Sequence, residues 1–124
     1  MSRILLVDDS ALARRRMRQT LEGAGYDVIE AEDGVVALER YFLEKPDLVL
    51  LDLVMHGMYG LDVLTKLREM DQAARIIVVS ADVQTSSQEL ASGMGARQFI
   101  SKPLDPDELL SAVAEVLGGG RPCS

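Results

Sequence analysis

Three short runs of apolar residues set the strongest limit on how this chain folds. Residues 4–7, 48–51 and 76–79 are continuously apolar rather than alternating, and branched side chains are frequent in them. Strands of this kind are buried on both faces, as in a parallel sheet that is covered by helices. Two weaker runs, 26–29 and 98–101, follow at similar intervals. The sequence therefore predicts a parallel sheet of five strands.

The segments between the runs show helical spacing of apolar residues, and each predicts one helix. The first begins at the cap Ser10, ends near Gly23 and Gly25, and is expected to bury Leu12, Met17 and Leu21. The second covers about 34–43, and its expected inward residues are Val35, Leu38 and Phe42.

The three remaining helices are expected at about 61–70, 85–94 and 106–117. The middle one is rich in Ser, Thr and Gly, which are weak helix formers, and is expected to be the most mobile. The last has the clearest boundaries, with Asp105 as cap, Pro106 in the first position and Gly118 after the end. The expected buried residues of the first and last of these helices are Leu61, Leu64, Leu67, Leu109, Val113 and Val116.

Alternation of strands and helices predicts a three-layer, doubly wound α/β domain with right-handed crossovers. The length of 124 residues, with 48% hydrophobic and 27% charged residues, fits one soluble globular domain. We expect this domain to span residues 1–118. Residues 119–124 are expected to form a flexible tail or the start of a linker.

Composition also limits the partners of the protein. The net charge of -7 disfavours direct binding to nucleic acid, because the phosphate backbone would be repelled. No apolar run is long enough for a membrane span, and the first run meets Asp8 and Asp9 where a signal peptide would stay apolar. Cys123 is the single cysteine, so no intrachain disulfide can form. A cytoplasmic protein is expected.

Polar residues follow four of the five predicted strands. Asp8 and Asp9 follow the first, Asp52 the third, Ser80 the fourth and Lys102 the fifth. Parallel strands bring their carboxyl ends to one edge of the sheet, where ligands bind in such folds. A single Asp or Ser after a strand is usually a loop former, but five such positions together predict a site.

Three clustered carboxylates repel one another and require a positive charge among them. Oxygen ligands select a hard cation, and Mg²⁺ is the one that accompanies phosphoryl groups. A carboxylate can also attack phosphorus, which makes Asp52 the candidate nucleophile. Lys102 would neutralise the phosphoryl group, Ser80 would donate a hydrogen bond to it, and Asp8 and Asp9 remain as metal ligands.

Four motifs resemble the receiver domain of bacterial two-component response regulators, of the chemotaxis type. They are Leu-Val-Asp-Asp-Ser at 6–10, Leu-Asp-Leu-Val-Met at 51–55, Ser-Ala at 80–81 and Lys-Pro-Leu at 102–104. The resemblance extends from Arg3 to about Leu117. It implies a flavodoxin-like sheet with strand order 2-1-3-4-5.

The resemblance also implies the roles of individual residues. Asp52 would accept a phosphoryl group from a histidine kinase or phosphotransfer protein, and the backbone carbonyl of Val54 would join Asp8, Asp9 and Asp52 around Mg²⁺. Phe99 would act with Ser80 as a switch that alters a partner-binding face. Such a domain is a phosphoacceptor rather than a conventional enzyme, although it catalyses its own phosphorylation and dephosphorylation. It would act on a downstream protein as a monomer or a weak, phosphorylation-dependent dimer.

Two segments depart from the family pattern. His56 stands where proline is frequent, and Gly57 lies beside it, so phosphoryl turnover is expected to differ. The segment Arg97-Gln98-Phe99 replaces the acidic pair and tyrosine of receivers that are joined to winged-helix domains. The dimer type of those receivers is therefore not expected here.

Other interpretations stay open at this point. The chain is consistent with a receiver excised from a larger regulator or hybrid kinase, and with a degenerate receiver that binds partners unphosphorylated. An aspartyl-nucleophile phosphatase is disfavoured, because Val54 stands where such an enzyme needs a second carboxylate. The arginines of the first helix form either a solvated face or a docking patch for the phosphodonor; they are Arg14, Arg15, Arg16 and Arg18.

Overall fold

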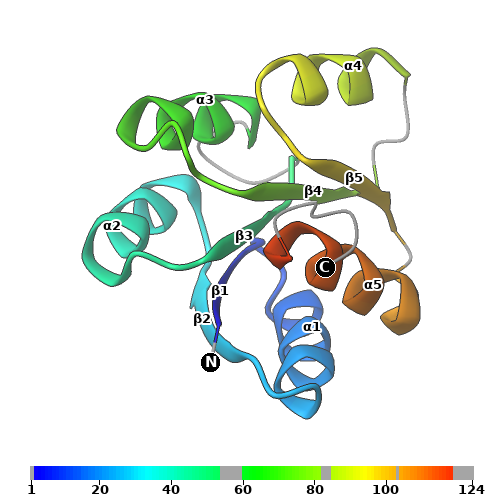
Figure 1. Ribbon diagram of the computed structural model, residues 1–124. Helices are drawn as coiled ribbons and strands as arrows, with labels where there is room; N and C mark the ends of the chain where they lie inside the picture. The colour runs from blue at the N-terminus through cyan, green and yellow to red at the C-terminus, as the bar shows by residue number, and fades with distance from the viewer. Residues whose placement is uncertain (1, 54–59, 82–84, 103, 119–124) are drawn as a thin grey trace.

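A computed structural model describes residues 2–53, 60–81, 85–102 and 104–118. Strands and helices alternate along the chain (Figure 1). Their bounds are β1 Arg3–Val7, α1 Ala11–Gly23, β2 Asp27–Ala31, α2 Gly34–Glu44, β3 Leu48–Leu51, α3 Gly60–Met70, β4 Ile76–Ser80, α4 Thr85–Gly93, β5 Gln98–Ser101 and α5 Pro106–Leu117.

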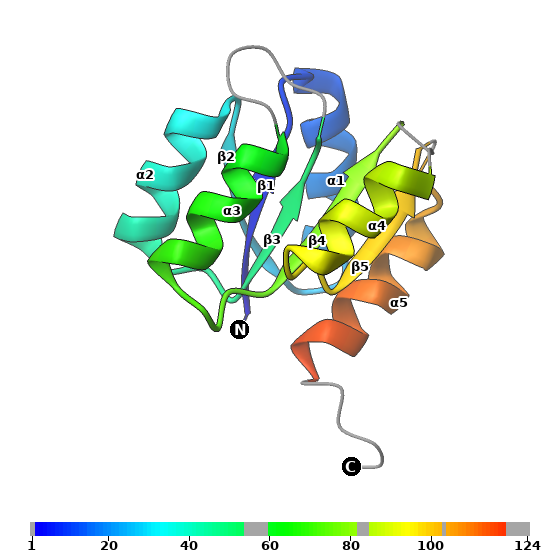
Figure 2. The same ribbon diagram turned by 90° about the horizontal axis from the view of Figure 1, so that it is seen from above.

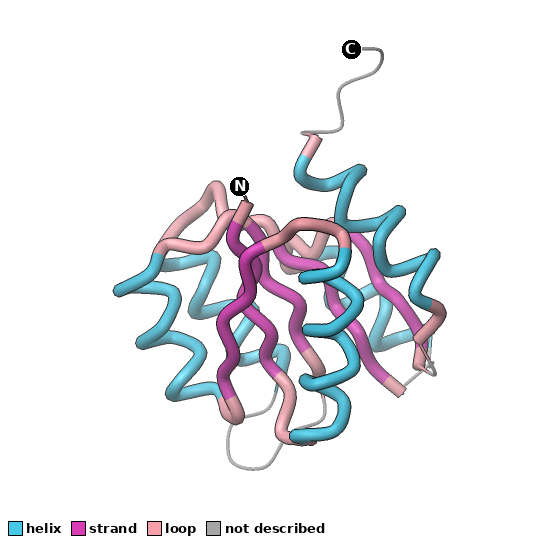
Figure 3. The backbone as a smooth tube through the Cα atoms, turned by 90° about the horizontal axis from the view of Figure 1, so that it is seen from below, coloured by secondary structure: helices cyan, strands magenta, loops and turns pink. Residues whose placement is uncertain are grey.

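The five strands form one parallel sheet in the order β2-β1-β3-β4-β5, as the resemblance implied. The helices lie on both of its faces, which gives the predicted three layers (Figures 2 and 3). Helices α1 and α5 cover one face, and α2, α3 and α4 cover the other (Figure 1). Because side chains alternate along a strand, Ile4 and Leu6 pack toward α1 and α5, while Leu5 and Val7 pack toward the other three helices.

The helix boundaries follow local capping chemistry. The hydroxyl of Ser10 accepts a hydrogen bond from the Ala13 amide at the start of α1, as predicted. Asp105 accepts from the Asp107 amide at the start of α5, and Gly118 is the C-cap. The expected inward residues of α3 and α5 are all buried.

Three inward assignments were wrong, because Leu12, Val35 and Phe42 are exposed. Helix α2 packs through Gly34, Ala37 and Tyr41 instead. Glycine and alanine let the helix approach the sheet closely, but they contribute little to an apolar pattern. The pattern therefore assigned the larger side chains, which lie on the exposed face, to the core.

Two strand ends also differ from the expected positions. Strand β2 runs from Asp27 to Ala31 rather than over 26–29, and its partly buried residue Glu30 lies in an edge strand beside Leu6. Ser80 is the last residue of β4 rather than the first residue after it. No helix in the described segments is long and apolar enough to span a membrane.

Candidate functional site

Backbone hydrogen bonds continue the sheet by one residue beyond the strand ends and thereby fix the site residues. The Asp8 amide donates to the Ala31 carbonyl at 3.2 Å, and the Asp52 amide donates to the Val7 carbonyl at 2.9 Å. At the other end of the site, the Lys102 amide donates to the Ser80 carbonyl at 3.0 Å. The sheet therefore holds these backbones in register with the rigid core.

Three of the polar side chains at this edge are buried. Asp8 is 1% exposed, Asp52 6% and Ser80 0%, and these three are the buried polar residues among the described part of the chain. Charged groups are rarely buried unless they are paired or coordinate a metal. The burial of two carboxylates at one point marks this edge as a site of chemistry rather than a set of loop residues.

Lys102 compensates part of the negative charge. Its ammonium lies 2.7 Å from Asp8 Oδ2 and 3.4 Å from Asp52 Oδ2. Burial alone would lower the pKa of Lys102, but the hydrogen bond to Asp8 and the charges of Asp52 and Asp8 outweigh it, so the pKa is raised. The side chain stays protonated at neutral pH and ties β5 to the ends of β1 and β3.

The predicted acidic cluster is present. Asp8, Asp9 and Asp52 each offer a carboxylate oxygen, and these oxygens lie within 4.8 Å of one another. Three oxygen donors with one neighbouring ammonium leave negative charge that a small, hard cation would balance. The donor set, three carboxylates gathered at one point, thus suits Mg²⁺ in its chemistry.

Gly60 was missed in the sequence, although it positions Asp52. Its amide donates to the Leu53 carbonyl at 3.0 Å, at the first residue of α3. A Cβ built on Gly60 would lie 2.3 Å from Leu53 Cα and 2.7 Å from the Asp52 carbonyl oxygen. No side chain fits in that space, so α3 can approach the Asp52 backbone only through glycine. A glycine where a helix starts was the signal for this close approach.

Phe99 and Ser80 lie close together on the adjacent strands β5 and β4. Phe99 pairs with Val78 across the β4–β5 ladder, and Ser80 lies two residues further along β4. Paired residues and residues two apart share one face, so both side chains point toward the α4 side. There the partly buried Phe99 ring packs against the core cluster that includes Ala91.

Not all of the predicted residues lie in the described part of the chain. Val54, His56, Gly57 and the tail 119–124 lie outside the described residues. Of the α1 arginines, Arg15 and Arg16 are exposed, whereas Arg14 and Arg18 both bind Glu30 of β2.

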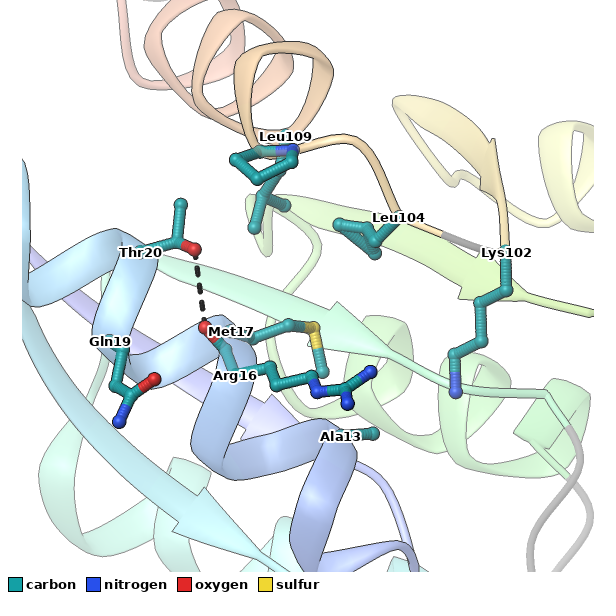
Figure 4. Close-up of a pocket in the computed structure, with 9 residues that line it drawn as sticks. Ala13, Arg16, Met17, Gln19, Thr20, Lys102, Leu104 and Leu109 are labelled. Atoms are coloured by element: carbon teal, nitrogen blue, oxygen red, sulfur yellow. Dashed lines mark hydrogen bonds between the residues drawn. The ribbon is translucent and has the colours of Figure 1, made fainter.

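An apolar hollow adjoins the site between α1 and the β5–α5 connection. It has a volume of about 400 Å³ and includes Met17, Leu104 and Leu109 in its wall. Figure 4 shows Lys102 at one end of this hollow and the Arg16 side chain extending along it. Lys102 thus belongs both to the acidic site and to the wall of this hollow.

The family model described as response regulator receiver domain matches residues 4–114. The chain is a response regulator receiver domain. Its relatives include chemotaxis protein CheY of Bacillus subtilis, which is 40% identical over 116 residues that cover 93% of this chain and 97% of the relative. The receiver family supports the switch interpretation and gives no support to the phosphatase.

Solved structures agree with this receiver fold. A CheY-like receiver domain protein from Methanospirillum hungatei has a TM-score of 0.92 and 28% identity, with 96% of this chain and 95% of that chain covered. The CheX-CheY-BeF3-Mg+2 complex from Borrelia burgdorferi contains a chain with a TM-score of 0.90 and 33% identity, with coverage of 93% and 88%. The receiver domain thus has the strand order and helix arrangement of its family.

Proposed function

We propose that this receiver domain is a two-component signalling switch that accepts a phosphoryl group on Asp52 in the presence of Mg²⁺. One observation carries the proposal: the buried Asp52 carboxylate lies 3.4 Å from the Lys102 ammonium and belongs to a trio of carboxylates that fits a hard cation. That arrangement can accept a phosphoryl group, because the Lys102 ammonium and a bound cation would offset the negative charge that the phosphoryl group brings to Asp52.

The phosphodonor is a phosphohistidine of a histidine kinase or phosphotransfer protein. An Asp52 oxygen attacks phosphorus, the new P–O bond forms as the P–N bond breaks, and the bond electrons leave with the donor imidazole. Lys102 neutralises charge on the transferring oxygens, and the Ser80 hydroxyl donates to one of them. Asp8, Asp9, Asp52 and the backbone carbonyl of Val54 would hold Mg²⁺, which would supply further positive charge next to the phosphoryl oxygens.

Dephosphorylation needs only water as the second reactant. Attack of water on phosphorus breaks the aspartyl P–O bond, releases inorganic phosphate and restores the Asp52 carboxylate. The domain therefore catalyses its own phosphorylation and dephosphorylation without being a conventional enzyme. The complex of a related CheY with BeF3 and Mg²⁺ supports the same ligand chemistry for this chain.

The output of the switch is a change in the surface next to β4 and β5. A phosphoryl group adds about two negative charges and three strong acceptor oxygens. Drawing the Ser80 hydroxyl toward those oxygens opens space on the face that it shares with Phe99, so the ring moves inward. Helix α4, whose residue Ala91 belongs to the cluster that Phe99 packs against, then presents an altered face to a downstream protein.

We assign the receiver domain to residues 1–118, and we place the protein in the cytoplasm as a monomer or a weak, phosphorylation-dependent dimer without direct nucleic-acid binding. The family match at 4–114 supports the boundary, and the net charge of -7 supports the last point. A receiver segment of a larger regulator or hybrid kinase would use the same site.

Intact-mass spectrometry after incubation with acetyl phosphate and Mg²⁺ tests the proposal. The native protein should gain about 80 Da, the mass of one phosphoryl group. Asp52→Asn should gain nothing, while Asp62→Asn, a matched change at an exposed residue of α3, should react like the native protein. An adduct that persists in Asp52→Asn, or that forms equally well in EDTA, would refute the assignment.

A further inference from the structure

Arg14 connects the outer surface of α1 to the backbone between the two acidic residues. Its Nη1 donates to the backbone carbonyl of Asp8 at 2.5 Å, and its Nε donates to Glu30 Oε1 at 2.9 Å. Only 14% of the Arg14 side chain is exposed, which sets it apart from the solvated arginines beside it. One guanidinium therefore spans from the edge strand to the site.

The Asp8 carbonyl lies just beyond the last residue pair of the β1–β2 ladder. The β1–β2 register ends with Val7 and Ala31, and the Asp8 amide makes one more bond to the Ala31 carbonyl. Beyond it, the bond from Arg14 takes the place of a strand partner for the Asp8 carbonyl. That carbonyl belongs to the peptide group that joins Asp8 to Asp9. The orientation of this peptide plane therefore determines the position of the Asp9 Cα, to which the side chain is attached.

The guanidinium is itself held in place. Glu30 accepts from Arg14 through one oxygen and from Arg18 Nη1 through the other, at 2.9 and 2.5 Å. Because Glu30 lies within β2 and is paired with Leu6, it is fixed to the sheet. A planar fork that is oriented by a carboxylate loses little freedom when it binds a second acceptor. The Glu30 carboxylate thus anchors the Arg14 guanidinium to β2, and the partly exposed Arg18 shares that carboxylate.

We propose that Arg14 is a positioning residue for the metal site, where it fixes the peptide between Asp8 and Asp9 so that both carboxylates face Asp52. The inference rests on the proposed magnesium-dependent function. It concerns only residues of this chain and assigns Arg14 no contact with the metal or the phosphoryl group. Groups that orient metal ligands typically change metal affinity by about 10-fold to 100-fold when they are removed.

The sign of the effect separates positioning from simple electrostatics. Arg14 carries positive charge next to a cation site, so Coulomb repulsion alone predicts that its removal tightens Mg²⁺ binding. Positioning predicts the opposite, a loss of about 10-fold in affinity. Arg14→Lys keeps the charge, but one ammonium cannot reproduce the fork that reaches both acceptors, so affinity should fall there as well.

The test is a Mg²⁺ titration of the unphosphorylated protein, followed by amide chemical shifts in two-dimensional NMR. We expect Arg14→Gln and Arg14→Lys to bind Mg²⁺ about 10-fold more weakly than the native protein. The control is Arg15→Gln, which removes one exposed charge from the same helix and should leave affinity unchanged or slightly tighter. The spectra also report whether each variant is folded.

Phosphorylation by acetyl phosphate supplies a second readout. If Arg14 acts through metal affinity, its variants need more Mg²⁺ for half-maximal phosphorylation, and the maximal rate recovers at saturating Mg²⁺. Equal or tighter Mg²⁺ binding in Arg14→Gln overturns the inference and leaves the proposed function intact. Absence of Mg²⁺ binding or of phosphorylation in the native protein overturns the proposed function, and the inference with it.

Discussion

The acidic cluster should make the resting protein less stable than it would be without Asp52. In Asp52→Asn the shape of the side chain is kept and one negative charge is removed. Each repulsion of Asp52 with Asp8 or Asp9, taken at 4.8 Å, amounts to about 3.5 kcal/mol at an effective dielectric constant of about 20. The lost attraction to Lys102 at 3.4 Å amounts to about 5 kcal/mol on the same scale. Relief of two repulsions against loss of one attraction leaves a net gain of about 2 kcal/mol in the free energy of unfolding.

Mg²⁺ should narrow this difference or reverse its sign. A ligand that binds only the folded state stabilises it by about 2.7 kcal/mol when its concentration is 100 times the dissociation constant. The native protein keeps all three carboxylates and should gain more from Mg²⁺ than Asp52→Asn. The same substitution is therefore expected to stabilise in EDTA and to give little or no advantage in saturating Mg²⁺.

Urea unfolding followed by circular dichroism measures both effects. The midpoint should rise in Asp52→Asn in EDTA without a change in the slope of free energy against urea. Glu39→Gln, an exposed change on α2, serves as the control and should shift the midpoint little in either condition. If Asp52→Asn proves less stable than the native protein in EDTA, the attraction between Asp52 and Lys102 outweighs the repulsion among the three carboxylates, and the reasoning is refuted.

Three further substitutions test separate contacts by urea unfolding. Gly60→Ala should lower the free energy of unfolding by about 1 to 3 kcal/mol, because the added Cβ meets rigid backbone. The control is Gly93→Ala, whose added Cβ has no atom within 4 Å and which should be neutral or slightly stabilising. Equal effects of the two substitutions would contradict the close approach at Gly60. Tyr41→Phe should lose about 1 kcal/mol, because the hydroxyl donates to Asp71 at 2.8 Å, and an unchanged midpoint would show that this bond contributes nothing. Glu30→Gln should destabilise at neutral pH. Burial raises the pKa of Glu30, but its two arginine partners outweigh burial and hold the pKa below the usual value. The stabilisation by ionised Glu30 is therefore fully present above the unfolded-state pKa of about 4.3, and it is lost as the pH falls through the pKa of the folded state. A pH-independent difference from the native protein would refute this last assignment.

The architecture could be predicted because its signals are local. Runs such as 48–51 are too short for helices and too continuous for half-exposed strands, and caps such as Ser10 and Asp105 mark the helix starts. The site could be predicted for a related reason: parallel strands bring their ends to one edge, so the positions of Asp8, Asp52 and Lys102 along the chain already imply that they meet. The strand order came from the resemblance, since periodicity does not determine which strands are neighbours.

The details of how the helices pack on the sheet were not predictable from the sequence. Val35 and Phe42 were assigned to the core because apolar side chains were counted, whereas the packing of α2 depends on the small residues Gly34 and Ala37. The role of Gly60 depends on how closely α3 approaches β3. Arg14 belonged to an unresolved choice between a solvated face and a docking patch, and its bond to the Asp8 carbonyl appears only when α1 is seated on the sheet.

The division of the core into two clusters has a consequence for the construction of chimeric receivers. Helices α1 and α5 share one cluster with inward residues such as Leu6, and the other three helices share the second with residues such as Leu5. Exchanging α1 and α5 together between two receivers would therefore replace one layer and keep the other layer and the switch face intact. The exchanged α1 would have to carry Arg14, and the retained β2 would have to carry Glu30, because this ion pair links α1 to the sheet.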